Sequence, residues 1–273
     1  MDTRFWGPSG WIFLHQISFS YNPEEQYESV RQLFEMLPFV LPCKFCRASL
    51  TEYMEELPLE PALKSRDALS VWLYEIHNKV NEKLRKQGQP ISANPSFASV
   101  KKFYSESLEN GCTKTFFPGW TFLFSVAENH PLSRQSLNTS PMPEAPARTS
   151  GMSEKDLNKY NLFRPQERMK FYKNFWYAVG ESLPFAEWRL HWKQLAKKYQ
   201  LGKKIGRRWP LVKALWKIRC EMEDSFELQN KTKFGDLCDT LASHRSGCAK
   251  SVRAKTCRRM RGSASHKRKT FRR

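Results

Sequence analysis

The stretch FVLPCKFCRASL, residues 39–50, places two cysteines three positions apart, directly after a proline and between apolar neighbours. Proline is well tolerated at the start of a helix, so we expect Cys43 in the first turn of a helix and Cys46 one turn further on. Backbone N–H groups at a helix start favour a thiolate and lower the pKa of a thiol. Such a pair can take electrons from a substrate dithiol by thiol–disulfide exchange, so the stretch favours a redox function.

Three other roles for this pair stay open. A zinc site needs four ligands, but the sequence has no second CxxC and its six histidines form no HxxxH pair, so we expect no metal. A structural disulfide would close a very small loop and stabilise little, and an inert buried pair is the third alternative. A thioredoxin-like motif would follow a strand, and no alternating strand pattern occurs. A redox pair here therefore needs another electron acceptor.

The segments around the pair predict an all-α fold, a four-helix bundle with a short fifth helix. Apolar residues recur at helical spacing, and Gly and Pro residues mark the ends of the segments. The expected helices span about 9–21, 24–37, 43–56 and 65–86, with the fifth near 95–108. No run of 18 or more apolar residues occurs, and the first residues lack the features of a secretory signal. We therefore expect no membrane span and a protein that works in the cytosol.

The second half predicts a separate helical domain. Residues 130–152 are rich in Ser, Thr and Pro and predict a linker or mobile loop. Helical periodicity then resumes through 153–230 and fades into a basic, Ser-rich stretch. We expect a first domain at 1–110, a second at 111–235 and a disordered tail at 236–273.

The net charge of +19 lies mainly in the second half and its tail. The tail is interpreted either as a solvated segment or nuclear-type address, or as an attachment to nucleic acid or another polyanion. It contains no base-reading motif. The seven cysteines are odd in number and irregularly spaced, which argues against a secreted disulfide scaffold.

Two sequence matches indicate an internal repeat. LPCKFCR at 41–47 aligns with LPFAEWR at 183–189, an offset of 142 residues. At the same offset, WLYEIHNKVNEKL at 72–84 aligns with ALWKIRCEMEDSF at 214–226. We predict a degenerate second copy of the first bundle that keeps the packing and has lost both cysteines. In this copy Phe185 corresponds to Cys43, and Trp188 corresponds to Cys46.

Two of the predicted helices carry polar side chains on otherwise apolar faces. His15 follows Trp11 by four residues, and His77, Asn81 and Leu84 share one face of the fourth helix. An inward His or Asn needs a buried polar partner. A flat ligand rich in heteroatoms, held between the helices, would supply that partner and would stack on an aromatic ring. Taken singly, such a Trp or His belongs to a core more often than to a ligand site.

Together the blocks WG-x3-W-x2-LH-x5-Y, PC-x2-C and W-x4-HN-x-VN-x2-L-x-K, in this order across residues 1–108, resemble the Erv/ALR family of FAD-linked sulfhydryl oxidases. The resemblance implies a helical bundle that binds FAD at its mouth and forms disulfides in protein substrates. By analogy, Cys43 exchanges with the substrate dithiol and Cys46 passes two electrons to the flavin. Oxygen then reoxidises the flavin and yields hydrogen peroxide.

The matching positions for FAD contact are Gly7, Gly10, Trp11, His15, Tyr21, His77, Asn78, Val80, Asn81, Leu84 and Lys86. Two departures from the family pattern bear on the flavin mouth. Many members carry a structural disulfide there, and the first of its positions is Tyr74 in this sequence. The late Trp of the fifth helix is best matched by Phe103 or Tyr104.

The resemblance extends to partners. The expected partners are protein dithiols and O2, with a homodimer or, if the repeat holds, an intrachain pseudo-dimer. Cys248 and Cys257 could act as a shuttle pair or be incidental thiols, and Cys112 is expected to be structural, unpaired or dimer-related.

The two-domain layout is similar to oxidases encoded by large DNA viruses, which implies virion assembly in the host cytoplasm. The alternatives are an Erv-like scaffold without catalysis and a CxxC electron carrier without flavin.

Overall fold

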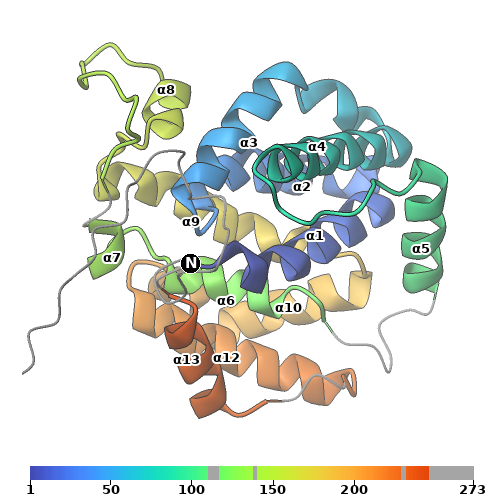
Figure 1. Ribbon diagram of the computed structural model, residues 1–273. Coiled ribbons are helices and arrows are strands. Elements are labelled where there is room, and N and C mark those ends of the chain that lie inside the picture. Colours follow the sequence, from blue (N-terminus) through green and yellow to red (C-terminus); the bar gives the residue numbers. More distant parts are fainter. Residues whose placement is uncertain (110–116, 138–139, 229–231, 246–273) are drawn as a thin grey trace, which may run out of the picture.

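The computed structural model describes residues 1–109, 117–137, 140–228 and 232–245, and these residues form helices and connecting loops without a strand (Figure 1). The predicted all-α fold is confirmed. A 3-10 turn, η1 (Glu60–Lys64), follows the third helix. The five helices expected in the first half are α1 (Thr3–Ser20), α2 (Pro23–Val40), α3 (Lys44–Glu56), α4 (Arg66–Lys86) and α5 (Phe97–Glu109).

Short polar side chains fix where three of these helices begin. Asp2 accepts a hydrogen bond from the N–H of Arg4, Asn22 from that of Glu24, and Ser65 from that of Ala68. Each satisfies a backbone donor that the first helical turn leaves without a partner. Because Asp2 caps the helix, α1 starts earlier than predicted and therefore includes Pro8.

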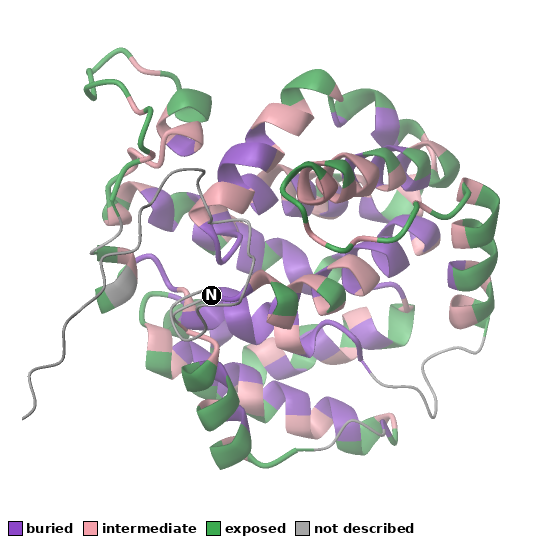
Figure 2. Cartoon of the chain, viewed as in Figure 1, coloured by how far each residue is buried: buried purple, intermediate pink, exposed green. Residues whose placement is uncertain are grey.

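The three longest helices of the second half are α9 (Pro165–Glu181), α10 (Ala186–Lys198) and α12 (Arg208–Ser225). The shorter helices described there are α6 (Trp120–Glu128), α7 (Arg134–Leu137), α8 (Glu154–Lys159), α11 (Leu201–Lys204) and α13 (Phe234–Ser243). The exposed loop before α8 projects from the body of the molecule (Figure 2).

Two of the predicted boundaries need correction. The tail was expected from residue 236, but α13 continues through that point and buries Leu237 and Leu241. The expected loop at 130–152 contains α7, and its first residue, His130, is buried with its Nε2 2.8 Å from the carbonyl oxygen of Ile205. The remainder of the predicted tail, residues 246–273, lies outside the described residues.

Three helices of the first half recur in the second half at a constant spacing of 142 residues. α9 begins at Pro165 and α2 at Pro23, α10 at Ala186 and α3 at Lys44, and α12 at Arg208 and α4 at Arg66. The residues that precede α3 and α10, Cys43 and Phe185, both stand at the N-cap position with extended backbone and no side-chain capping bond. This regular spacing supports the predicted repeat.

The two halves pack on each other through α1 on α6 and through the equivalent helices α2 and α9. The contacts are reciprocal. Gln26 donates through Nε2 to the carbonyl oxygen of Glu181 at 3.2 Å, and Arg168 donates through Nη2 to that of Phe39 at 2.9 Å. Residues 168 and 181 lie 142 positions after 26 and 39, so the same two positions meet twice with exchanged roles. A two-fold interface between identical patches has this property.

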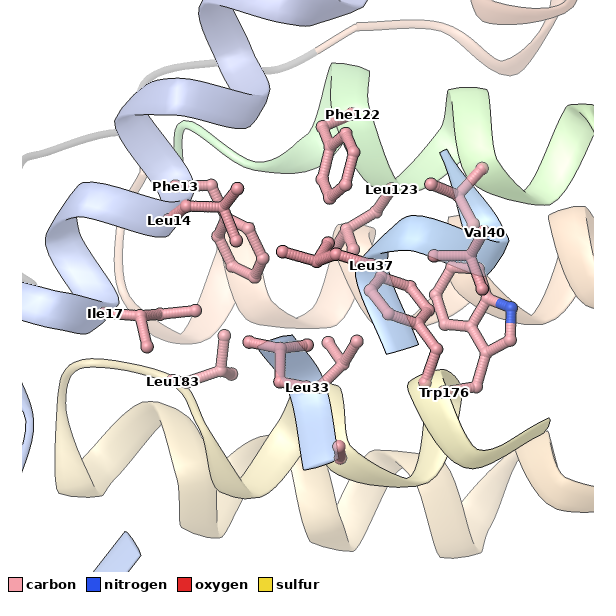
Figure 3. Close-up of a cluster of buried hydrophobic side chains, with 14 of the residues drawn as sticks. Phe13, Leu14, Ile17, Leu33, Leu37, Val40, Phe122, Leu123, Trp176 and Leu183 are labelled. Atoms are coloured by element: carbon pink, nitrogen blue, oxygen red, sulfur yellow. The ribbon is translucent and has the colours of Figure 1, made fainter. Parts of the chain in front are cut away.

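One hydrophobic core joins the two halves (Figure 3). Side chains from α1, α2, α6 and α9 converge on it, and most of them are fully buried. Removing apolar surface from water in this way is the largest favourable contribution to folding. The labelled members are Phe13, Leu14, Ile17, Leu33, Leu37, Val40, Phe122, Leu123, Trp176 and Leu183. Among the described residues, no helix is long and apolar enough to cross a membrane.

Candidate functional site

The two cysteines lie where the chain turns from α2 into α3. Cys43 is the N-cap residue of α3, and its carbonyl oxygen accepts from the N–H of Arg47 at 3.0 Å. The Arg47 side chain is buried and donates back to the carbonyl oxygen of Leu41 at 2.9 Å, which fixes the turn. In the second half Arg189 makes the equivalent bond to Leu183 at 3.1 Å.

The two sulfurs differ in accessibility. Cys43 is only 2% exposed, whereas Cys46, one turn into α3, is half-buried against the core. A thiol at the start of a helix is favoured as a thiolate by the backbone N–H groups there. Of the two residues, Cys46 is therefore the more accessible in this structure.

A pair of histidines links α1 and α4. His15 Nε2 lies 3.1 Å from His77 Nδ1, so one ring donates to the other. Trp11 stacks on the His77 ring with centroids 3.8 Å apart and planes 8° from parallel. Burial, with a smaller contribution from the neighbouring His77, lowers the pKa of His15 to about 3, and burial lowers the pKa of His77 to about 4. Both rings are therefore neutral near pH 7.

The helix α5 covers this pair. Tyr104 is buried and stacks on His15 at 5.0 Å and on Phe19 at 5.3 Å, and burial raises the pKa of its hydroxyl. Phe103 is 59% exposed, so Tyr104 is the aromatic residue that α5 contributes to the site. The family resemblance matches the late Trp of the fifth helix to either Phe103 or Tyr104. The packing of α5 favours Tyr104.

The C-terminal part of α4 carries the remaining predicted contacts. Asn81 donates to Asn94 Oδ1 at 3.0 Å, and Arg85 donates to the same oxygen at 3.1 Å, which ties the loop after α4 to the helix. Lys83 donates to Ser49 and thereby joins α4 to the cysteine helix. Lys86 is exposed and forms an ion pair with Glu82.

Three predicted positions lie apart from the histidine pair or serve in packing. Tyr21 is fully buried, and its hydroxyl donates to the carbonyl oxygen of Leu63 at 3.0 Å. A Cβ at Gly10 would lie 3.2 Å from the Phe122 ring, so this glycine lets α1 approach α6. Gly7 faces open space.

The residues around the histidine pair fit a flat, polar cofactor such as FAD. His15 Nδ1 is buried and has no hydrogen-bond partner among the described residues, and an orphaned buried nitrogen needs one. Asn78 is half-buried, with no side-chain hydrogen bond among those residues. Val80 and Leu84 are likewise half-buried apolar residues on α4. These positions, together with Trp11 and His77, could hold such a group.

The equivalent region of the second half is filled by its own side chains. His77 and Asn81 correspond to Arg219 and Glu223, which form a buried ion pair at 2.7 Å. The Arg219 guanidinium lies 5.9 Å from the ring of Trp120, and Trp188, at the position of Cys46, packs 5.0 Å from the Phe117 ring. Met222 is fully buried where Val80 of the first half is half-exposed.

The histidine pair predicts a loss of stability in acid. The unfolded chain takes up a proton at His77 as the pH falls through about 6.5, whereas the folded chain does so only near pH 4, so stability present above pH 6.5 is lost between those values. Between pH 7 and pH 5 the wild type should lose about 2 kcal/mol more than His77→Gln in chemical denaturation. His130, whose pKa burial also lowers, is present in both proteins. Parallel losses in both would contradict the buried neutral pair.

Comparison with known proteins identifies the family. The model of the Erv1 / Alr family matches residues 8–103. The FAD-linked sulfhydryl oxidase of African swine fever virus (isolate Tick/Malawi/Lil 20-1/1983) is 32% identical over 125 residues, which cover 43% of this chain and 98% of the viral protein. This chain belongs to the Erv1/Alr family. No solved structure was found to match it.

Two further relatives are matched over a shorter part of their length. The mitochondrial FAD-linked sulfhydryl oxidase ERV1 of Saccharomyces cerevisiae is 35% identical over 88 residues, 31% of this chain and 46% of the yeast protein. A probable FAD-linked sulfhydryl oxidase, R368, of Acanthamoeba polyphaga mimivirus is 36% identical over 86 residues, 30% of this chain and 59% of that protein. The chain thus spans about half the length of these two relatives.

Proposed function

We propose that this protein is an FAD-dependent thiol oxidase that forms disulfides in protein substrates through Cys43 and Cys46. The observation that carries the proposal is the stacked Trp11–His77–His15 group, which brings two of the three family motifs together and leaves His15 Nδ1 without a partner among the described residues. The helix α3, which carries the third motif, packs against α4. The relatives named FAD-linked sulfhydryl oxidases support the same function.

The chemistry divides between the chain and its cofactor. Cys43 would exchange with a substrate dithiol, so that two substrate thiols become a disulfide and the Cys43–Cys46 pair is reduced. When bound, FAD would supply the acceptor for two electrons and pass them to O2, giving H2O2. The neutral histidines, Asn78 and Trp11 would hold and orient the cofactor, with Val80 and Leu84 as apolar walls.

A flavin spectrum tests the proposal. The purified protein should show an absorption band at about 450 nm, which is typical of bound flavin, and should retain it through gel filtration. Trp11→Ala and His77→Ala should weaken the band, because they remove the stacked pair. A colourless protein that takes up no added FAD would defeat the proposal and leave a scaffold or a flavin-free electron carrier.

The second half would act as a built-in partner. Family members usually form homodimers through their first two helices, and here α6 packs on α1 and α9 packs on α2. We therefore expect an intrachain pseudo-dimer that is monomeric in solution. Sedimentation should give the 32.2 kDa mass of one chain at micromolar concentration. This arrangement would be contradicted by a stable dimer that dissociates when the charge of Arg168 is reversed.

The viral relatives support a proposal for the cellular setting. We propose that the oxidase serves virion assembly in the host cytoplasm, since proteins of African swine fever virus and mimivirus are among its relatives. Three cysteines lie outside the described residues: Cys248 and Cys257, predicted to be a shuttle pair or incidental thiols, and Cys112, predicted to be structural, unpaired or dimer-related.

A further inference from the structure

A stretch of the second half contains many basic residues and no acidic one. Between Glu187 and Glu221 the sequence contains eleven Lys or Arg residues and no Asp or Glu. This stretch forms most of α10, all of α11 and most of α12, and these three helices pack on one another. The charge therefore belongs to a folded surface and is separate from the basic residues beyond 245.

Most of these cations point into solvent. Among the described residues, no carboxylate forms an ion pair with six exposed ones: Lys197, Lys203, Lys204, Arg207, Lys213 and Lys217. The other five cations of the stretch have carboxylate partners: Glu25 for Arg189, Glu181 for Lys193, Glu221 for Lys198, Glu128 for Arg208 and Glu223 for Arg219. We call the surface formed by the six exposed cations the basic face.

Aromatic rings lie among the cations of the basic face. Trp209 is 44% exposed, with the Arg208 guanidinium 4.8 Å from its ring. The ring of Tyr199 is flanked by Lys198 and Lys217, each 5.4 Å from its centroid. Along α12, Trp209 is followed at four-residue intervals by Lys213 and Lys217, and all three are exposed. One stripe of this helix thus presents a ring and then two ammonium groups.

The fold does not require this charge. The equivalent stretch of the first half, residues 46–78, forms the same helices with six carboxylates and three Lys or Arg residues. Glu55, Glu56 and Glu75 stand 142 positions before Lys197, Lys198 and Lys217. Two surfaces of one architecture therefore carry opposite charge, which points to a ligand for the basic one.

We propose that the basic face binds single-stranded nucleic acid. Lysines held on three packed helices can neutralise successive phosphates of a backbone, and exposed rings give unpaired bases a surface to stack on. An anionic membrane fits less well, because a membrane-binding helix gathers its apolar residues into one stripe and its cations into another. On α12 the ring and the ammonium groups share a stripe.

The test separates the basic face from the other basic residues of the chain. The full-length protein carrying Lys197→Glu, Lys203→Glu and Lys213→Glu is compared with a control carrying Lys64→Glu, Lys101→Glu and Lys155→Glu. All six are surface lysines, so both variants change the net charge equally. Binding of a fluorescent oligothymidine is measured by anisotropy over a series of salt concentrations. The melting temperature and the flavin spectrum check that both variants fold.

We expect the basic-face variant to bind at least about tenfold more weakly than the control, with the salt slope reduced by about 2, since each single-strand phosphate contact contributes roughly 0.7. Trp209→Ala should weaken binding several-fold and leave the slope unchanged, because stacking does not release counterions. Equal affinities of the two triple variants would overturn the proposal. The proposal would also be overturned if the basic-face variant lost binding to phosphatidylserine vesicles but kept binding to the oligonucleotide. That result would assign the basic face to membrane binding.

Discussion

Cys46→Ser should abolish oxygen consumption with dithiothreitol as the substrate, a loss on the order of a thousandfold. The side chain sits one turn into α3, half-buried, on the helix that packs against α4. A serine hydroxyl cannot form the disulfide that transfers two electrons, so the reaction stops whatever the substrate. Because the change is nearly isosteric, the flavin band should persist.

A matched control separates this effect from a general sensitivity to cysteine loss. Cys220 lies half-buried on α12, and burial raises the pKa of its thiol, as expected for an inert cysteine. Cys220→Ser should therefore consume oxygen like the wild type. Equal rates in Cys43→Ser, Cys46→Ser and the wild type would rule out the proposed relay.

Phe122→Ala should lower the free energy of unfolding by about 3–5 kcal/mol. The ring is fully buried on α6 and meets side chains of α1, lying 6.0 Å from the ring of Trp6 and 6.1 Å from that of Phe13. Its removal leaves a cavity at the junction of the two halves. Since both halves share this core, they should unfold in one transition, and flavin should be released in that same transition.

Denaturation followed by far-UV circular dichroism and by flavin fluorescence measures this effect. Leu190→Ala is the control, because Leu190 is 59% exposed on α10 and should change stability by less than about 0.5 kcal/mol. Two separate transitions, with flavin retained after the second half has melted, would show that the halves are independent.

The first-half helices are predictable because the signals are local. Apolar periodicity, caps such as Ser65 and breakers such as Pro23 act within a few residues of the boundary they set. The motif spacing likewise identifies His15 and His77, which the structure brings within hydrogen-bonding distance. A motif match, however, gives the position of a residue in the sequence and not the direction in which its side chain points.

Details that the sequence could not supply depend on distant parts of the chain. The motif position of Gly10 predicts a cofactor contact, and the structure adds that this residue packs on Phe122, which lies far along the sequence. The prediction of a tail from residue 236 rests on the basic composition of this region. It does not take into account Leu237 and Leu241, four residues apart, which are the buried residues of α13. Tyr104 could be preferred over Phe103 only once α5 was seen to cover His15.

Anaerobic reduction of the bound flavin tests the central claim most directly. Dithiothreitol added without oxygen should bleach the absorption near 450 nm in the wild type and in Cys220→Ser, and admitting air should restore it. Cys46→Ser should keep its yellow colour under the same treatment. Bleaching of that variant at the wild-type rate would mean that electrons reach the flavin without the cysteine pair, and the account would be wrong.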